Sequence, residues 1–279
     1  MWEIMDILWP ALAACVILTG IHCYLGLHVV SRGVIFVDLA LAQVAALGST
    51  LALLAGYELE SPQAYAAALA FTVIGAALFA LGRFRDEVVP QEAIIGIVYA
   101  VGSAAAILIL DRAPHGGEAI RQMLIGSILY VSWGTVLKTA LIYSAVGVAH
   151  FIFRKQFLLI STDIAEARRR RMPIRFWDFL FYSTFGLVVT SSVQIAGILM
   201  VFSYLVVPAV CAMLFFKTIR ARLVAGWTTG LLFSVVGLSA SAWADLPTGA
   251  AVVAAFGAAV ILAAVGRVLL AKKFRGGAS

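Results

Sequence analysis

Apolar residues run along this chain in long blocks that polar residues interrupt only briefly. A helix that crosses about 30 Å of hydrocarbon needs roughly 20 mostly apolar residues. Blocks of that length predict membrane-spanning helices near residues 7–28, 33–55, 63–82, 93–110, 131–153, 177–193, 195–216, 223–243 and 248–268. The pattern therefore predicts an all-α, polytopic membrane helix bundle in which residues 1–279 form one transmembrane domain.

The sixth and seventh predicted spans share one continuous apolar run, from Phe176 to Phe216. This run is too long for a single helix across a bilayer, and its polar residues Ser191, Ser192 and Gln194 indicate where it breaks. Division at that point gives nine spans. A single span followed by a half-helix would give eight, and the pattern leaves both counts open.

Composition agrees with a lipid environment. Of the 279 residues, 63% are hydrophobic and 12% are charged, and the mean hydropathy is +1.04. A soluble domain carries about 25% charged residues, so this chain has too few polar groups to cover its own surface in water. The first residues, MWEIMD, are acidic and lack a basic region, so we expect no cleaved signal peptide.

The basic residues are unevenly distributed along the chain. If the N-terminus lies outside and the C-terminus in the cytoplasm, all 20 Lys and Arg residues fall in predicted cytoplasmic segments except Arg112, Arg121 and Lys138. Cytoplasmic loops of membrane proteins are rich in Lys and Arg, so the distribution favours this orientation. The net charge of +6 then reflects orientation, and we expect no nucleic-acid partner.

The second predicted span contains a carboxylate. Ionisable residues inside spans are functional candidates, so Asp38 is a candidate cation ligand or pathway residue. The alternative is a structural carboxylate that pairs with Arg32 or with a neighbouring helix. Gln43 lies five residues on, about 140° around the helix, and could line the same pathway or bond to another helix. The small residues from Ala40 to Ser49 favour a place inside the bundle.

Three further polar residues are candidates for metal contact. His22 lies deep in the first span, and imidazole is a ligand that suits Zn, Mn or Fe. Glu92 opens the fourth span, where it could line the pathway or simply complement the helix dipole. His115 lies in a predicted outer loop, where it could meet an incoming metal.

The longest predicted cytoplasmic segment, 154–178, contains the sequence STDIAEARRRR. This pattern predicts a short helix that Ser161 or Thr162 caps, with acids in its first turn, arginines in its last and Pro173 beyond its end. Such a basic helix could dock a cytoplasmic partner, or it could only anchor the loop inside. The chain has no GxxxxGK[ST] phosphate loop, so ATP-driven transport would need an ATPase on a separate chain.

Several motifs, in order and spacing, resemble those of the permease subunits of the bacterial zinc/manganese (ABC-3) import family. They are GVIFVDLALAQVAALG (33–48), EAIIGIVYAVGSA (92–104), LIGSILYVSW (124–133), FLLISTDIAEA (157–167), AGILMVFSYLVVPAVCA (196–212) and DLPTGA (245–250). The resemblance implies a multi-pass protein of the bacterial inner membrane that imports a divalent metal by alternating access and performs no chemistry itself.

The resemblance also implies partners and roles. Two permease copies would form the pore as a homodimer, two cytoplasmic ATPase subunits would drive it, and an extracytoplasmic binding protein would deliver Zn, Mn or Fe. No cofactor would stay bound. Asp38, Gln43 and His22 would line the metal path, with Glu92 and His115 as possible further contacts. The coupling helix would match Asp163 to Arg171, including Ala165, Glu166, Ala167 and Arg168.

The second span departs from the family pattern. The family motif typically reads GDALSHA, with Asp and His four residues apart on one face, whereas this chain reads VDLALAQ. Because the imidazole is missing, a zinc site of the usual kind is not expected, and oxygen ligands suit Mn or Fe better. A chelated metal or another substrate stays open, as do an ATP-independent secondary transporter and an intramembrane enzyme, although no paired nucleophile and base occurs at recognisable spacing.

Overall fold

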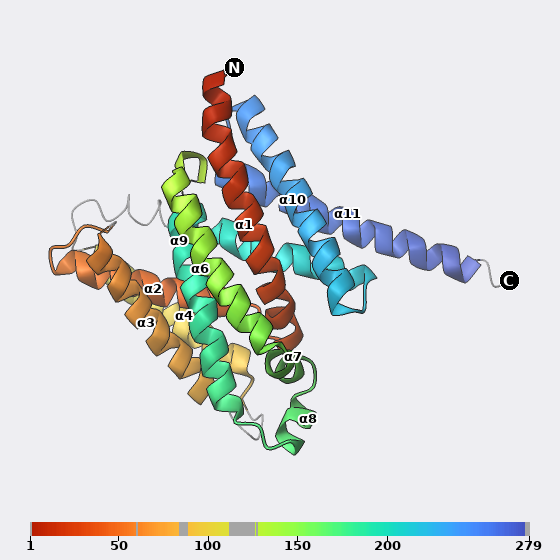
Figure 1. The fold of residues 1–279 in the computed structure, drawn as a ribbon, viewed down its shortest axis with the longest axis horizontal. Helices are drawn as coiled ribbons and strands as arrows, with labels where there is room; N and C mark the ends of the chain where they lie inside the picture. Colours follow the sequence, from red (N-terminus) through yellow and green to blue (C-terminus); the bar gives the residue numbers. More distant parts are fainter. Residues whose placement is uncertain (1, 60, 84–88, 112–125, 127, 277–279) are drawn as a thin grey trace.

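The computed structural model describes residues 2–59, 61–83, 89–111, 126 and 128–276, with side chains from 8 to 270. The described chain is helical (Figure 1). Its elements are α1 (Trp2–Arg32), α2 (Val37–Leu54), α3 (Pro62–Leu81), α4 (Gln91–Leu110), the 3₁₀ helix η1 (Ile128–Tyr130), α6 (Trp133–Ile152), α7 (Arg154–Thr162), α8 (Ile164–Arg169), α9 (Ile174–Phe215), α10 (Ile219–Ala244) and α11 (Thr248–Gly276).

Helices α1 and α9 form the centre of the bundle. Figure 1 shows α2, α3 and α4 together on one side of them and α10 and α11 on the other, and α9 contacts helices of both groups. The short helices α7 and α8 lie at the end of the bundle where α1 finishes at Arg32. We call this end the coupling end; the charge pattern predicts that it faces the cytoplasm.

Helix α9 has 42 residues, which at 1.5 Å per residue is about 63 Å and twice the thickness of a hydrocarbon core. The helix is interrupted at Gly197, where φ is 75° and ψ is 161°. Glycine adopts this conformation without the steric penalty that a side chain brings. The apolar run that the sequence divides into two spans is therefore two helices joined at this kink.

The predicted position of this break, at Ser191 to Gln194, is wrong. These residues are helical, and the hydroxyls of Ser191 and Ser192 donate to the carbonyls of Leu187 and Val188 at 2.6 Å. A serine that bonds back by four residues satisfies its own polar group inside a helix, so it need not end one. The break falls at the glycine instead.

Small residues let α2 pack tightly in the interior, as the sequence predicts. Gly48 lies against α3, where an added Cβ would come within 2.6 Å of the Ala67 carbonyl oxygen. Gly26 of α1 lies even closer to the α9 backbone at Leu205. These contacts leave no room for larger side chains, so the helices approach one another backbone to backbone.

The outward faces of the bundle are apolar. Large exposed side chains on α4 and α11 include Ile97, Leu108, Ile261 and Leu262. By length and composition, eight helices in the described part of the chain could each cross a membrane, with the kinked α9 counted once. The predicted all-α, multi-pass membrane bundle is confirmed, and its nine predicted segments each have a counterpart when the two parts of α9 are counted separately.

Candidate functional site

Two carboxylates lie where α2 and α4 begin, one on a buried residue and one on a partly exposed residue. Asp38 is the second residue of α2 and is 1% exposed, and its Oδ1 has no hydrogen-bond partner. Glu92 is the second residue of α4, and its Oε1 accepts a hydrogen bond from the Phe36 N–H at 3.1 Å. Because Phe36 is the N-cap of α2, Glu92 ties the starts of the two helices together.

The second oxygen of Glu92, Oε2, is also buried and has no hydrogen-bond partner. Asp38 and Glu92 both belong to the first turns of their helices, whose starts the Glu92–Phe36 hydrogen bond joins. Buried polar atoms are normally hydrogen-bonded, and two unpaired acids of like charge are unfavourable in a low-dielectric interior. A cation between them would relieve both problems. The arrangement therefore suits transient binding of a positively charged ion by oxygen ligands.

Gln43 lies on the same helix pair. It is partly exposed on α2 and lies against Gly102 of α4, where an added Cβ would come within 3.7 Å of the Gln43 Cβ. The contact between α2 and α4 thus brings three of the predicted pathway residues, Asp38, Glu92 and Gln43, to one seam between two helices. We call it the α2/α4 seam.

His22 is held in a different network. It is fully buried in α1, its Nδ1 lies 2.9 Å from the Leu18 carbonyl oxygen and its Nε2 lies 3.1 Å from the Ser192 hydroxyl. That hydroxyl also bonds to Tyr143 of α6. Both ring nitrogens of His22 therefore have protein partners on α1 and α9, and none of them is a residue of the α2/α4 seam. His115 lies outside the described residues.

Within the described residues, no cluster of three or more His, Cys, Asp and Glu side chains could hold a metal ion. Two carboxylates with free oxygens make a weaker site than a complete ligand set would. A transport path needs such weak binding, because an ion must be accepted and then released. The geometry thus fits passage of a cation better than permanent storage.

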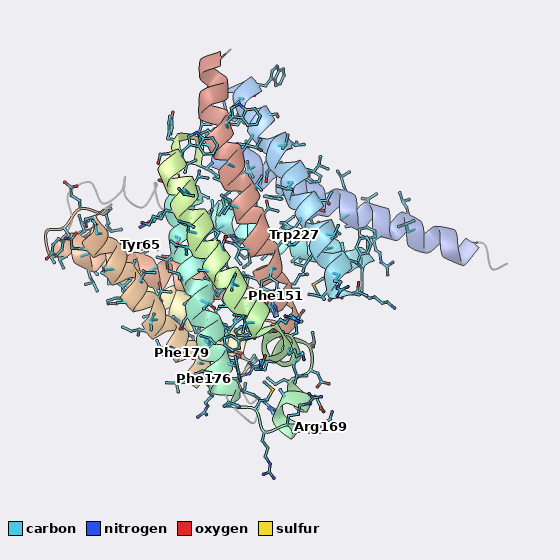
Figure 2. The ribbon with its side chains drawn as sticks, viewed as in Figure 1. Tyr65, Phe151, Arg169, Phe176, Phe179 and Trp227 are labelled. Atoms are coloured by element: carbon cyan, nitrogen blue, oxygen red, sulfur yellow. The ribbon has the colours of Figure 1, made fainter. Side chains whose placement is uncertain are left out.

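A cavity of about 400 Å³ lies farther along α2, toward the end opposite the coupling end. Its polar lining comes from Ser49, Tyr65, Thr190, Gln194 and the cationic Lys138, and Ala42, Ala45 and Ala46 of α2 add apolar surface. The Lys138 ammonium lies 5.0 Å from the centre of the Tyr65 ring, whose place at the edge of the bundle is labelled in Figure 2. The cavity is open to the outside of the described structure and lies between α2, α3, α6 and α9.

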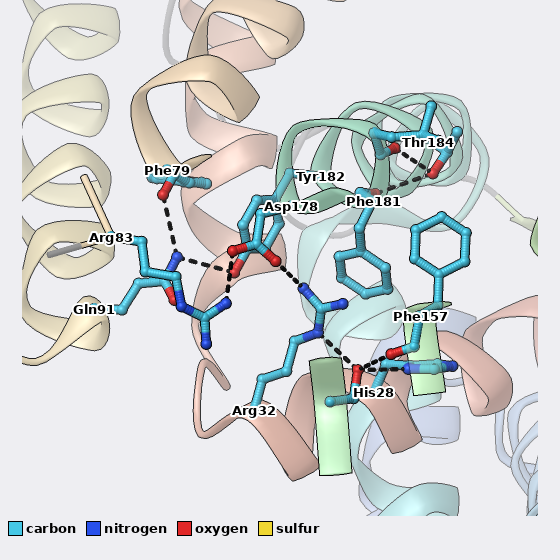
Figure 3. Close-up of polar contacts among 12 residues, drawn as sticks. His28, Arg32, Phe79, Arg83, Gln91, Phe157, Asp178, Phe181, Tyr182 and Thr184 are labelled. Carbon is cyan, nitrogen blue, oxygen red and sulfur yellow. Dashed lines mark hydrogen bonds and ion pairs between the residues drawn. The ribbon is translucent and has the colours of Figure 1, made fainter. Parts of the chain in front are cut away.

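A buried ion cluster lies at the coupling end (Figure 3). The Asp178 carboxylate of α9 accepts from Arg32 Nη1 at 2.8 Å and from Arg83 Nη1 at 2.6 Å. The side chains of Arg32 and Asp178 have no exposed surface, and that of Arg83 is 17% exposed. The sequence alternative in which Arg32 pairs with Asp38 is therefore wrong, because Arg32 pairs with Asp178.

Sequence reasoning missed this cluster. Asp178 lies in the apolar stretch FWDFLFY, and this acid among aromatic residues was the available signal. It resembles the signal that drew attention to Asp38. The missing information was the partner, since Arg32 and Arg83 are far from Asp178 in sequence.

The predicted coupling segment folds as two helices, α7 and α8, rather than one. Ser161 and Thr162, the predicted caps, are the last residues of α7. The cap of α8 is Asp163, whose carboxylate accepts from the Glu166 N–H at 2.9 Å. Both hydroxyls bond back to carbonyls within α7 and so extend that helix, which leaves the next residue as the cap.

Helix α8 presents charged groups at the edge of the molecule, where Figure 2 labels Arg169. Glu166 forms ion pairs with Arg169 at 2.6 Å and Arg170 at 2.7 Å. Hydrogen bonds from Arg170 and then Arg169 lower the pKa of Glu166 below its usual value. On the inner side of the helix, Ala167 is fully buried. One face of α8 is thus anchored, and the other is available to a partner.

Comparison with known proteins agrees with this architecture. The family model described as "ABC 3 transport family" matches residues 4–267. The manganese transport system membrane protein MntC of Listeria innocua is 28% identical over 191 residues, or 64% of this chain and 66% of the relative. A probable iron transport system membrane protein of Haemophilus influenzae is 24% identical over 248 residues, which cover 89% of this chain and 86% of the relative.

Among solved structures, PsaBC from Streptococcus pneumoniae in complex with Fab matches with a TM-score of 0.77 and 22% identity over 94% of each chain. At this identity the likeness shows the fold. In three of the curated relatives, including the Listeria protein, the matched region covers 58% to 66% of the relative's own length.

Proposed function

Because this chain belongs to the ABC 3 transport family, we propose that it is the permease subunit of an ATP-driven importer of a divalent transition metal. The observation that carries the proposal is the pair of carboxylates, Asp38 and Glu92, at the α2/α4 seam. Each has one buried oxygen without a hydrogen-bond partner among the described residues, and a cation bound there would supply that partner.

The chemistry of the seam favours manganese or ferrous iron over zinc. Its candidate ligands, Asp38, Glu92 and Gln43, offer oxygen atoms, and neither α2 nor α4 carries a histidine. Carboxylate and carbonyl oxygens suit Mn²⁺, whereas zinc sites commonly use His or Cys. The names of the Listeria and Haemophilus relatives, which refer to manganese and iron, agree with this preference.

The remaining machinery would be supplied by other chains. Helix α8, with its exposed arginines and its buried Ala167, is a candidate docking element for a cytoplasmic ATPase. An extracytoplasmic binding protein would deliver the metal to the side that carries the 400 Å³ cavity. A second permease copy would complete the pore. Alternating access would then move the ion from the cavity along α2 to the acids near the coupling end.

The test is metal uptake into vesicles that contain the permease, its ATPase and the binding protein. Asp38→Asn and Glu92→Gln each keep the shape of the side chain and remove its charge, and we expect each to reduce uptake by about 100-fold or more because only one carboxylate remains. Asp111→Asn, an exposed acid at the other end of α4, is the matched control and should transport normally.

Other outcomes would support different functions. Uptake by the permease alone without ATP would indicate a secondary transporter. Turnover of a substrate by the purified chain would indicate an intramembrane enzyme. Normal uptake by both carboxylate variants, with the complex intact, would remove these acids from the pathway.

A further inference from the structure

We propose that the Arg32–Asp178–Arg83 cluster is a positioning relay through which α7 sets the separation of Asp38 and Glu92. The inference rests on the proposed transport function and names the residues that would couple ATPase movement to the metal site. Four connections build the argument.

The first contact joins three helical elements at one carboxylate. Asp178, in the second turn of α9, binds Arg32 at the end of α1 and Arg83 just beyond the end of α3. The Arg32 guanidinium also lies 4.0 Å from the centre of the Phe181 ring. A buried, charge-assisted pair of this kind has little freedom to rearrange without breaking. A movement of Arg32 therefore displaces α9, or the reverse.

The second contact leads from the cluster to Asp38. Only the short segment from Gly33 to Phe36 separates Arg32 from the start of α2. Within it, the Val34 N–H bonds to the Val29 carbonyl at 3.2 Å and the Val37 N–H bonds to the Val34 carbonyl at 3.2 Å. The connection is thus short and internally bonded, so a displacement of Arg32 is passed to the first turn of α2, which carries Asp38.

The third contact leads from the same part of α9 to Glu92 (Figure 3). Gln91, the residue before Glu92, donates from Nε2 to the Tyr182 hydroxyl at 3.0 Å and to the Phe79 carbonyl at 3.1 Å. Tyr182 lies one turn after Asp178 on α9 and is fully buried. The first turns of α9 therefore hold the starts of both helices that carry the metal-facing carboxylates.

The fourth contact brings in α7. The Ser161 hydroxyl donates to the Phe157 carbonyl at 2.8 Å and accepts from Arg32 Nε at 2.8 Å. His28 Nδ1 lies 2.8 Å from the same oxygen. A hydroxyl has one proton to donate and two lone pairs. Because Ser161 donates its proton to the Phe157 carbonyl, its oxygen accepts hydrogen bonds from both Arg32 and His28. Ser161 is thus the point at which α7 holds the end of α1.

Together these contacts form a continuous path. Helix α8 adjoins α7 at Asp163, α7 holds Arg32 through Ser161, and Arg32 and Asp178 hold the starts of α2 and α4. A shift of α7 toward or away from the bundle would change the distance between Asp38 and Glu92. Closer carboxylates would bind a cation more tightly, and separated carboxylates would release it.

The test compares Ser161→Ala with Thr162→Ala in the reconstituted complex. Thr162 is the neighbouring residue of α7, is exposed and bonds only to the Leu158 carbonyl at 2.8 Å, so it is a matched control. The readouts are Mn²⁺ transported per ATP hydrolysed, and Mn²⁺ affinity with and without vanadate-trapped nucleotide. Wild type should show ATP-driven transport and a different affinity in the two states.

We expect Ser161→Ala to hydrolyse ATP but to transport about tenfold fewer ions per ATP, because Arg32 Nε loses its link to α7. The affinity difference between the two states should shrink by a similar factor, while Thr162→Ala behaves as wild type. Arg32→Lys is the second variant: a single ammonium nitrogen does not reproduce the guanidinium fork that reaches Ser161 from Nε and Asp178 from Nη1, so it should also uncouple.

The outcomes separate the relay from the proposed function. If wild type shows no ATP-driven metal transport, the function itself is wrong. If wild type transports while Ser161→Ala and Arg32→Lys keep its ratio of ions to ATP and its change in affinity, the function stands and the relay is overturned. An equal loss in Thr162→Ala would also overturn the relay, since that residue is outside the path.

Discussion

Arg32 lies six residues before Asp38 in the chain, yet its Nη1 bonds at 2.8 Å to Asp178, a residue 146 positions away. The two buried acids, Asp178 and Asp38, therefore have different surroundings. Asp178 is neutralised by arginines and fixes the helices, whereas Asp38 keeps an unpaired oxygen. We therefore propose Asp38 and Glu92, and not Asp178, as the acids that attract a cation.

Loss of Asp178 should destabilise the protein strongly. Asp178→Ala would leave Arg32 as a buried charge without its partner, and breaking a buried pair costs about 3–5 kcal/mol. We expect a lower midpoint of thermal unfolding for the purified protein in detergent. Asp111→Ala, which removes an exposed acid, should shift the midpoint little. Equal shifts for the two variants would mean that the cluster does not hold the helices.

The kink in α9 should depend on the conformation of Gly197. Its φ of 75° and ψ of 161° lie in a region that is essentially restricted to glycine, and Gly197→Ala should cost about 1–3 kcal/mol. Gly147→Ala is the control, because Gly147 lies in α6 with open space around it and alanine favours helix. Thermal unfolding of both variants checks this prediction, which fails if Gly197→Ala is as stable as wild type.

Much of the fold could be predicted because block length and hydropathy report directly on membrane spans. The position of the kink could not be predicted. In the sequence, Ser191 and Ser192 indicate a helix break, whereas in the structure their hydroxyls are hydrogen-bonded within the helix. The interior place of α2 was predictable from its small residues, such as Gly48, because only close packing makes use of them.

The candidate site was predictable in part. An acid in an apolar helix is visible in sequence, which marks Asp38, and Glu92 at the start of its helix was a possible further pathway contact. That both acids lie at the α2/α4 seam depends on how α2 and α4 pack, and no pattern within either helix reports it. For the same reason the role of Ser161, which touches Arg32 across 129 positions, could not be read from the capping pattern.

The cap of α8 should influence ATPase docking. Asp163→Ala removes the acceptor for the Glu166 N–H, and loss of such a cap costs a helix about 1 kcal/mol. We expect about fivefold weaker binding of the ATPase to the permease in a pull-down titration. Asp163→Asn, which can still cap, should bind as wild type, and undiminished binding by Asp163→Ala would show that the ATPase does not depend on this helix end.

Docking through α8 should be insensitive to pH near neutrality. The pKa of Glu166 is lowered from its usual 4.5 by Arg170 and Arg169. A carboxylate with a lowered pKa stabilises the folded state above its unfolded pKa and loses this effect as the pH falls through the folded value. ATPase affinity should therefore be flat from about pH 6 to about pH 8. A decline within that window would assign the docking to a different titrating group.

Metal preference should change if an imidazole is returned to the α2/α4 seam. Gln43 stands against Gly102 of α4, where the smallest residue leaves room for a larger side chain. Gln43→His would add a nitrogen ligand near oxygen ligands, and such a ligand favours zinc over manganese. We expect the ratio of Zn²⁺ to Mn²⁺ uptake, measured in competition in reconstituted vesicles, to rise by about tenfold, the factor that 1.4 kcal/mol of added binding supplies. Gln63→His is the control: it changes an exposed amide of α3 that is neither at the seam nor among the residues that line the cavity, so its ratio should stay near that of wild type. If Gln43→His transports both metals in the wild-type ratio, Gln43 lies beside the path and not on it.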